Sequence, residues 1–236
     1  MFRARRLIVV FVTLIGVSVI IAPRVQANSS SLSADLVGAA RQLLVVSVDR
    51  KIDTVGRLST YEMTNGVWAR VLGPVEARVG RSGIKSNRRE GDGSTPVGSF
   101  GLIGSFGWGK RALAKFPYRA VRRGDCWVSN SSQASYNRRI NSATCGYPNE
   151  DLWRIARGGS YDMAVISDFN YERPIRGKGS AIFLHVHSYT KQGRSKPTSG
   201  CVSVVKSAMS KILEWLDSAK SPRIVITQRR DLPPGW

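Results

Sequence analysis

The stretch Arg57–Leu72, RLSTYEMTNGVWARVL, establishes the β character of this chain of 236 residues. Its two halves, Arg57–Thr64 and Val67–Leu72, are rich in β-prone residues and flank the pair Asn65-Gly66. A tight two-residue turn needs a positive φ at both of its positions, and Asn and Gly tolerate that conformation best. The stretch therefore predicts a β-hairpin with its turn at Asn65 and Gly66.

Further β-prone runs lie on both sides of the hairpin, at Leu44–Val48, Ala181–Ser188 and Arg223–Thr227. Side chains alternate between the two faces of a strand. In the second run, we therefore expect one face to carry Ile182, Leu184 and Val186 and the other to carry Phe183, His185 and His187.

One helix is expected near the C-terminus. Met209, Ile212, Leu213 and Leu216 follow the spacing of an apolar helix face, and Ser207 can cap the first turn.

The pattern as a whole predicts one mainly-β domain over residues 43–227, with this helix packed on it. The polar stretch 110–160 is expected to be an insertion, and residues 228–236 are expected to be a C-terminal tail.

The composition agrees with a globular domain and narrows the class of partner. Hydrophobic residues make up 42% and charged residues 22%, which excludes a collagen-like, coiled-coil or wholly disordered chain. The net charge is +20, so the partners are expected to be anionic. Two His and three Cys are too few for an array of zinc modules.

The N-terminus has the pattern of an export signal. Three arginines within the first six residues precede the uncharged apolar run Leu7–Ala22, and Val25–Ala27 is typical of a cleavage site. We interpret residues 1–27 as a signal peptide and the Ser-rich residues 28–42 as a linker. An uncleaved signal anchor, which would hold the protein at the membrane, is the alternative, although the run is shorter than the roughly twenty residues that span a bilayer.

If the protein is exported, its anionic partners are those that lie outside the cytoplasmic membrane. Without residues 1–27 the chain keeps a net charge of +16. An exported basic protein encounters cell-wall polymers and lipid head groups rather than the chromosome. We therefore expect it in the cell wall, the periplasmic space or the medium, with affinity for anionic wall polymers and no nucleic-acid partner.

The three cysteines suit an oxidising compartment if two of them pair. Cys126 and Cys145 close a short loop within the polar insertion, and a bridge there would stabilise the fold by roughly 3 kcal/mol. Cys201 would then be a free thiol. A bridge that involves Cys201 is the alternative and would remove that thiol.

Cys201 lies in a context that suits a nucleophile. It follows Thr198–Gly200 at a glycine turn, where consecutive backbone N–H groups can converge on an oxyanion, and it precedes an apolar strand. A thiol is a weak nucleophile until it loses its proton, which a nearby imidazole can accept. His185 is the best candidate for that base. A metal site at His185 and His187 lacks a third ligand nearby in the sequence.

Two motifs occur in a known order. His185 is followed, after a spacer, by Thr198-Ser199-Gly200-Cys201-Val202, and an earlier stretch, Gly91–Phe100, reads GDGSTPVGSF. The first is similar to a His, a spacer and Ser/Thr-His-Gly-Cys, and the second is similar to G-x-x-x-T-P-x-G-x-F. Together they resemble the L,D-transpeptidase catalytic domain (YkuD-like) family over about residues 43–227. The resemblance implies a mainly-β, sandwich-like catalytic domain with a helix packed beside it.

The chain departs from the family pattern at two positions. Ser199 stands where the family usually has His, and Ser203 stands where Arg or Asn is expected. A subgroup with I-F-L-H-V and T-x-G-C-V-A/S fits Ile182–Val186 and the residues around Cys201 better.

The resemblance implies a secreted cysteine acyltransferase that acts on peptidoglycan stem peptides, and hence a role in cell-wall biogenesis and cell shape. Cys201 would attack the third stem residue and release D-Ala, and an amine of a second stem peptide would then complete a 3→3 crosslink without a cofactor. His185 would act as the base, oriented by the carbonyl of Val186. The N–H groups of Cys201 and Gly200, with Ser199, would hold the oxyanion.

His187, Thr198 and Ser203 are further candidates for substrate binding. Two alternatives to the transpeptidase remain open. An L,D-carboxypeptidase would use the same acyl-enzyme but release it to water. A non-catalytic wall-binding module would depend on the positive charge alone.

Overall fold

The computed structural model of the chain describes residues 32–236. The expected signal segment 1–27 and the first residues of the expected linker lie outside the described part. Within that part, no helix has the length and apolar composition needed to cross a membrane.

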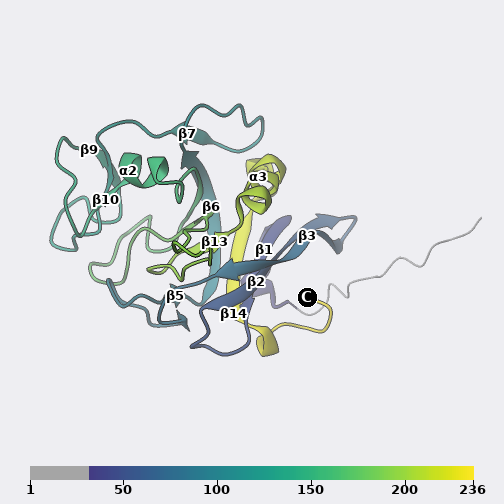
Figure 1. Cartoon of the computed structure of the whole chain (residues 1–236). Helices are drawn as coiled ribbons and strands as arrows, with labels where there is room; N and C mark the ends of the chain where they lie inside the picture. The colour runs from purple at the N-terminus through teal and green to yellow at the C-terminus, as the bar shows by residue number, and fades with distance from the viewer. Residues whose placement is uncertain (1–31) are drawn as a thin grey trace, which may run out of the picture.

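The main sheet of the described part has nine strands, and eight of them close into a barrel-like ring (Figure 1). Hydrogen-bonded neighbours around the ring are β11 (Met163–Ser167), β12 (Phe183–Val186), β13 (Val202–Val204), β3 (Val67–Arg78), β2 (Val55–Thr64), β1 (Gln42–Val48), β14 (Arg223–Gln228) and β6 (Gly98–Gly107). The long strand β6 makes the closure, because it pairs with β14 through Gly98–Gly101 and with β11 through Leu102–Gly107. The predicted mainly-β class is correct, but the sheet closes into a barrel rather than forming the expected sandwich.

The remaining elements of residues 32–236 are short apart from one helix. They are β7 (Tyr118–Ala120), β4 (Ile84–Lys85), β5 (Thr95–Pro96), β8 (Asp125–Trp127), β9 (Arg139–Asn141), β10 (Glu150–Asp151), α1 (Ala34–Val37), α2 (Leu152–Arg157), α3 (Lys206–Trp215) and the 3₁₀ turns η1 (Ser218–Lys220) and η2 (Arg229–Asp231).

The predicted hairpin is confirmed. β2 and β3 pair antiparallel up to Thr64 opposite Val67, and Asn65 and Gly66 between them have φ values of 51° and 77°. The turn residues therefore adopt the backbone conformation for which Asn and Gly are suited.

The predicted C-terminal helix is α3, which lies beside the barrel (Figure 1). Its buried face consists of Ala208, Met209, Ile212 and Leu213. The expected cap at Ser207 is wrong, because the helix starts at Lys206 and its N-cap is Val205, without a side-chain hydrogen bond. Strand β13 ends at Val204, so a single residue, Val205, separates the strand from the helix and takes the N-cap position.

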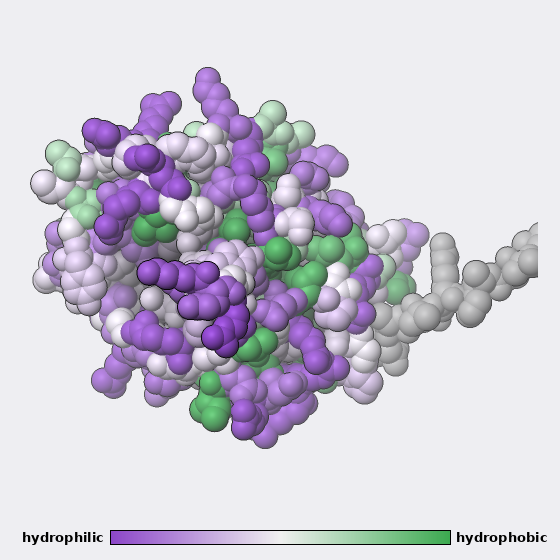
Figure 2. Space-filling model, viewed as in Figure 1, coloured by the Kyte–Doolittle hydropathy of each residue, from purple (hydrophilic) through white to green (hydrophobic). Residues whose placement is uncertain are grey.

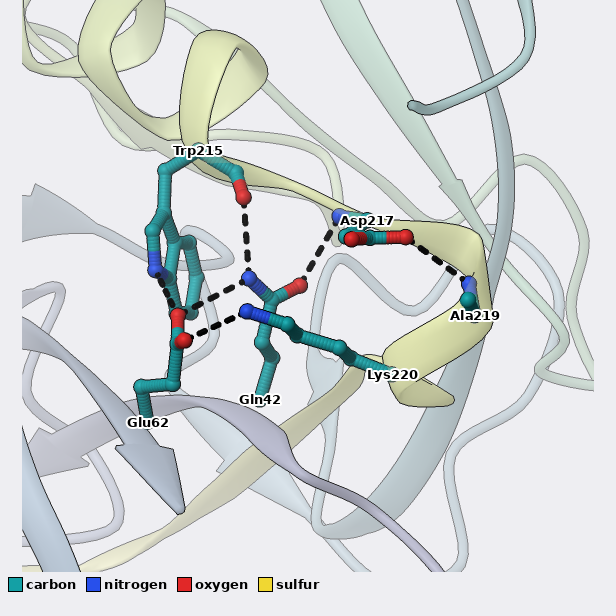
Figure 3. Close-up of polar contacts among 6 residues, drawn as sticks. All are labelled: Gln42, Glu62, Trp215, Asp217, Ala219 and Lys220. Atoms are coloured by element: carbon teal, nitrogen blue, oxygen red, sulfur yellow. Dashed lines mark hydrogen bonds and ion pairs between the residues drawn. The ribbon is translucent and has the colours of Figure 1, made fainter. Parts of the chain in front are cut away.

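A polar network ties the end of α3 to β1 and β2 (Figure 3). Glu62 accepts hydrogen bonds from Trp215 Nε1 at 2.7 Å and Gln42 Nε2 at 3.2 Å, and it also pairs with Lys220. Gln42 is fully buried, donates to the Trp215 carbonyl and accepts from the Asp217 N–H. Burial raises the pKa of Glu62, but the hydrogen bonds from Lys220, Gln42 and Trp215 outweigh it and lower the pKa below its usual value.

We expect Glu62→Gln to lower the free energy of unfolding at pH 7 by about 1–2 kcal/mol, because three donors lose an ionised acceptor. The folded-state pKa of Glu62 is depressed, so the native carboxylate stabilises fully above its unfolded pKa and loses this effect as pH falls through the folded pKa. The difference between native protein and variant should therefore shrink in urea unfolding measured at pH 3. Glu172→Gln, at an exposed residue, is the matched control and should change nothing. A constant difference at both pH values would contradict the prediction.

The insertion 110–160 is more ordered than its polar sequence indicates. It contains the small sheet β10-β8-β9 and helix α2, and the expected bridge between Cys126 and Cys145 is present, which leaves Cys201 free. The side chain of Asn137 fastens the insertion to the approach of β12, because its Oδ1 accepts from Trp127 Nε1 at 2.9 Å and from the Ala181 N–H at 3.0 Å.

Replacement of both Cys126 and Cys145 by Ala is expected to lower the free energy of unfolding by roughly 3 kcal/mol, the loop-entropy value for a bridge of this span. The two residues are 19 apart in the chain. Urea unfolding monitored by tryptophan fluorescence measures the effect, and reduced native protein should match the variant. Equal stability of the oxidised protein and the variant would show that the insertion holds its shape without the bridge.

Both ends of the described chain pack on the barrel. Leu32 is buried, and the Trp236 ring lies 4.5 Å from that of Tyr61 and 6.2 Å from that of Trp68, measured between centroids. The end of the expected linker and the expected tail thus contribute to one apolar cluster. The molecular face in Figure 2 is otherwise dominated by hydrophilic residues with apolar ones scattered among them, in keeping with the basic composition.

Candidate active site

The candidate nucleophile lies where β12 and β13 run side by side. The two strands are parallel, with His185 opposite Ser203, and Cys201 directly precedes β13. The Cys201 thiol donates to the Ala181 carbonyl at 3.1 Å, and Sγ accepts from the Phe183 N–H at 3.4 Å. Its side chain belongs to a buried cluster with Phe183 and Tyr161, and Cys201 is only 6% exposed.

Two threonines, one from each sequence motif, hold the Cys201 backbone. Thr198 Oγ1 donates to the Cys201 carbonyl at 2.6 Å, and Thr95 Oγ1 donates to the same oxygen at 3.2 Å. Thr95 is fully buried and in turn accepts from the Gly80 N–H. The GDGSTPVGSF stretch therefore contacts the cysteine motif at Cys201, the candidate nucleophile.

Gly200 gives the turn its shape. Its φ is 146°, and a Cβ at this position would lie 3.0 Å from the Ser94 carbonyl oxygen. The Gly200 N–H donates to Thr198 Oγ1 at 3.1 Å, so this expected oxyanion donor is engaged in the structure. Ser199, also expected to contribute, lies at the exposed tip of the turn.

His185 is held by the contact that the resemblance predicts. Its Nδ1 lies 2.7 Å from the Val186 carbonyl oxygen. The ring is buried, and the Tyr161 ring packs edge-on against it at 5.2 Å between centroids. Burial lowers the pKa of His185 to about 4, although the hydrogen bond to Val186 acts in the opposite direction. The imidazole is therefore neutral at pH 7, as a proton acceptor must be.

The thiol and the imidazole lie on the same side of the strand pair, joined through Tyr161 rather than by a direct bond. Among the described residues, Sγ of Cys201 has no hydrogen bond to His185. The Tyr161 hydroxyl donates to Glu150 at 2.6 Å. Burial and the Glu150 charge together raise the pKa of Cys201 to about 12, although the Phe183 N–H, the Arg88 charge and the Tyr161 hydroxyl act in the opposite direction. The resting thiol is thus protonated.

Residues 42–226 match the L,D-transpeptidase catalytic domain (YkuD) family. The chain belongs to this family. No curated protein matches it. Among solved structures it is similar to the helical cell shape determining protein Pgp2 from Campylobacter jejuni, at 16% identity and a TM-score of 0.42 over 79% of this chain and 47% of that one. The K307A mutant of Pgp2 gives 16% identity and a TM-score of 0.40 over 81% and 52%. The chain thus spans about half the length of these structures.

A cleft of about 670 Å³ opens at the end of β12 in this L,D-transpeptidase family domain, and its lining includes neither Cys201 nor His185. The residues that follow His185 along the chain, Val186, His187 and Ser188, form one wall. The lining carries three cations and one carboxylate, namely Arg157, Lys196, Lys206 and Asp162. The cleft is therefore suited to an anionic ligand. A second cavity, of about 450 Å³, lies at Ser47–Arg57 and likewise contains neither Cys201 nor His185.

The three expected substrate-binding residues of the domain separate in space. His187 lines the cleft, and its Nδ1 lies 2.9 Å from Ser203 Oγ. Ser203 is fully buried, and Thr198 is committed to the Cys201 turn. Only His187 of the three therefore faces the cleft.

Several residues of the site are absent from the expectations drawn from sequence. They are Arg88, Thr95, Glu150 and Tyr161. Thr95 carries a signal, because it belongs to the second motif, and Arg88 lies three residues before that motif. Glu150 and Tyr161 belong to the insertion and its exit, where the sequence shows no pattern. Residues 32–236 contain no cluster of three or more His, Cys, Asp or Glu side chains that could hold a metal ion.

Proposed function

We propose that the protein is an exported L,D-transpeptidase that crosslinks peptidoglycan stem peptides through a thioester at Cys201. The observation that carries this proposal is the fixed orientation of His185. Its Nδ1 is bound to the Val186 carbonyl, beside a free cysteine whose backbone both family motifs hold. A base oriented by a third group next to a nucleophile is the arrangement that acyl transfer requires.

The first half-reaction forms the acyl-enzyme. The Cys201 thiol gives its proton to His185 Nε2, and sulfur attacks the carbonyl carbon of the third stem residue. The C–S bond forms and the carbonyl oxygen becomes an oxyanion. When the oxyanion collapses, the C–N bond to D-Ala breaks, and the imidazolium returns its proton to the leaving amine.

The second half-reaction releases the acyl group. The side-chain amine of a second stem peptide attacks the thioester, His185 takes its proton, and the new amide bond replaces the C–S bond. Sulfur leaves and recovers its proton from His185. The product is a 3→3 crosslink, and no cofactor takes part.

Two local changes connect the resting structure to this reaction. The thiol must leave the Ala181 carbonyl and turn toward His185, a rotation about the Cys201 side chain. Catalytic hydrogen bonds are often long or misaligned before substrate binds. For the oxyanion we assign the Cys201 N–H, joined by that of Gly200 once the Thr198 hydroxyl releases it.

The cleft beside His187 suits the donor substrate. A stem peptide ends in a carboxylate, and the cleft lining has an excess of cations. The disulfide is typical of an exported protein, and the basic surface would retain the enzyme on an anionic wall.

Two observations favour other functions. Ser199 replaces the His usual in the family, and water could resolve the same acyl-enzyme, which gives an L,D-carboxypeptidase. The missing hydrogen bond between Cys201 and His185 in the described residues would also suit a silent module that binds wall polymers by charge.

A product assay separates these functions. The protein without residues 1–27 is incubated with a disaccharide tetrapeptide, and the products are identified by their masses in mass spectrometry. A crosslinked dimer that has lost one D-Ala establishes the transpeptidase, and tripeptide alone establishes the carboxypeptidase. A folded protein with a free thiol and no product would refute both enzymes in favour of the binding module.

A further inference from the structure

Arg88 is a buried cation without a partner. It is 5% exposed, and its Nε and Nη1 have no hydrogen-bond acceptor among the described residues. The nearby carboxylate of Asp92 is committed elsewhere, to the N–H groups of Arg89 and Ser94 and to Lys85 at 3.8 Å. A guanidinium removed from water without an anion is costly, so its retention requires an explanation.

The guanidinium lies against the turn that carries the nucleophile. A Cβ on Gly200 would be 3.2 Å from Nη1 and 3.3 Å from Nη2 of Arg88, and a Cβ on Gly179 would be 2.9 Å from Cζ. Both glycines have positive φ values, 146° and 123°. Cζ also lies 5.8 Å from the centroid of the Phe169 ring. Two glycines without side chains thus leave a slot in which the guanidinium lies next to Gly200, the residue that precedes Cys201.

The other charges around Cys201 do not favour an anion there. Glu150 faces the thiol through Tyr161 and opposes thiolate formation, and burial acts in the same direction. His185 is neutral. Arg88 is the cation whose charge lowers the pKa of the Cys201 thiol, and it also contributes to the lowered pKa of Asp92.

We propose that Arg88 is a positioning residue that supplies the counter-charge for the negative charge formed at Cys201, first on the sulfur and then on the oxyanion of the acyl-transfer step. At rest the guanidinium has no hydrogen-bonded anion within the described part of the chain, and an opposite charge forms near it when the proton leaves the thiol. A fixed charge in a buried site acts without reorganisation at the moment of reaction. A substrate carboxylate is the less favoured anion, because Nε and Nη1 are sealed by protein atoms.

This inference deepens the proposed function, but its test needs no turnover. Cys201 is the free thiol of the protein, so its alkylation by iodoacetamide can be followed by mass spectrometry from pH 6 to pH 10. Arg88→Met keeps the length and removes the charge. We expect it to react at least tenfold more slowly than native protein at pH 9 and at pH 10, because both pH values lie below the raised pKa of the thiol and the thiolate fraction falls as that pKa rises further. Arg88→Lys should restore most of the rate.

The matched control is Arg70→Met. Arg70 also packs on an aromatic ring, that of Tyr61, but in a different apolar cluster from Cys201. It should alkylate like the native protein. If Arg88→Met does not fold, circular dichroism will show this, and its thiol will be alkylated rapidly with the pH dependence of a free cysteine. Arg88→Lys is then the variant to compare with the native protein.

A second measurement uses the native protein alone. A cation next to the thiol should raise the rate of alkylation by anionic iodoacetate more than the rate by neutral iodoacetamide. The ratio of these two rates for Cys201 should therefore exceed the same ratio measured for glutathione. The preference should persist in 0.5 M NaCl, which screens exposed charges.

Three results would overturn the proposal. These are an unchanged rate profile in folded Arg88→Met, no alkylation of the folded native protein at any pH, or an effect confined to the KM for tetrapeptide. The last result would assign Arg88 to substrate binding instead. Because alkylation is independent of stem peptides, a protein without transpeptidase activity could still show the Arg88 effect, and an active one could lack it.

Discussion

Cys201→Ala should reduce formation of both crosslinked dimer and tripeptide below detection, a loss of at least ~10³-fold. The reason is chemical, because without sulfur no thioester forms and both half-reactions stop. The measurement is the mass-spectrometric assay on disaccharide tetrapeptide, with intact-protein mass to detect the acyl-enzyme. Native protein should show the acyl adduct, and the variant should not.

The same substitution should leave the fold intact. The Cys201 side chain makes one hydrogen bond as donor and one as acceptor, so its removal should cost about 1–2 kcal/mol of unfolding free energy. The Cys126→Ala/Cys145→Ala protein is the natural counterpart, because it should lose more stability and retain acyl transfer under conditions where it is folded. The reverse pattern, with activity lost in the bridge variant and kept in Cys201→Ala, would refute Cys201 as the nucleophile.

Local signals were sufficient to predict the hairpin, the C-terminal helix and the bridge. Asn65-Gly66 and the apolar spacing in α3 are contained in a few consecutive residues, and a pair of cysteines in a polar insertion leaves little choice. The closure of the barrel depends instead on β6, which pairs with both β14 and β11. Sequence alternation does not encode which strands become neighbours, so sandwich and barrel are indistinguishable at that level.

The same limit applies to the site. Cys201 and His185 carry motif signals, and the Val186 carbonyl follows from the resemblance. Arg88 and Gly179 come next to Gly200 only through the fold, and Tyr161 reaches the two candidate catalytic side chains after an insertion without periodicity. Residue types alone could not distinguish Arg88 from the other cations of so basic a chain. What distinguishes it is burial without a partner, which only the packed structure reveals.

Replacement of His185 is expected to have the second large effect, and it can be compared with replacement of His187, which lies just past the end of β12. His185→Gln keeps a polar side chain of similar size but cannot shuttle a proton, so kcat should fall by ~10²- to 10⁴-fold. His187 lies two residues along, on the wall of the cleft, with its Nδ1 near Ser203. His187→Gln should mainly raise KM for tetrapeptide. Steady-state kinetics of both variants measure the split, and a larger kcat loss in His187→Gln would transfer the role of base to that residue.

The protonation of His185 adds a check that activity alone does not give. Its pKa is lowered by burial to about 4 in the folded protein, against about 6.5 for a free side chain. A depressed pKa means that the neutral ring contributes full stability above pH 6.5 and that this contribution is lost as pH falls toward 4. Burial also raises the pKa of Glu150 to about 7, and this carboxyl acts in the opposite direction over the same window. The effect of His185 is therefore read as a difference: native protein should lose free energy of unfolding relative to His185→Gln as the pH falls from 6.5 to 4. The acid limb of kcat/KM should likewise lie near pH 4 rather than pH 6.5, because the free enzyme keeps its base unprotonated down to that pH. A limb near 6.5, with equal slopes of stability for both proteins, would mean that the ring is exposed in solution and that the buried geometry beside Tyr161 is not the one that reacts.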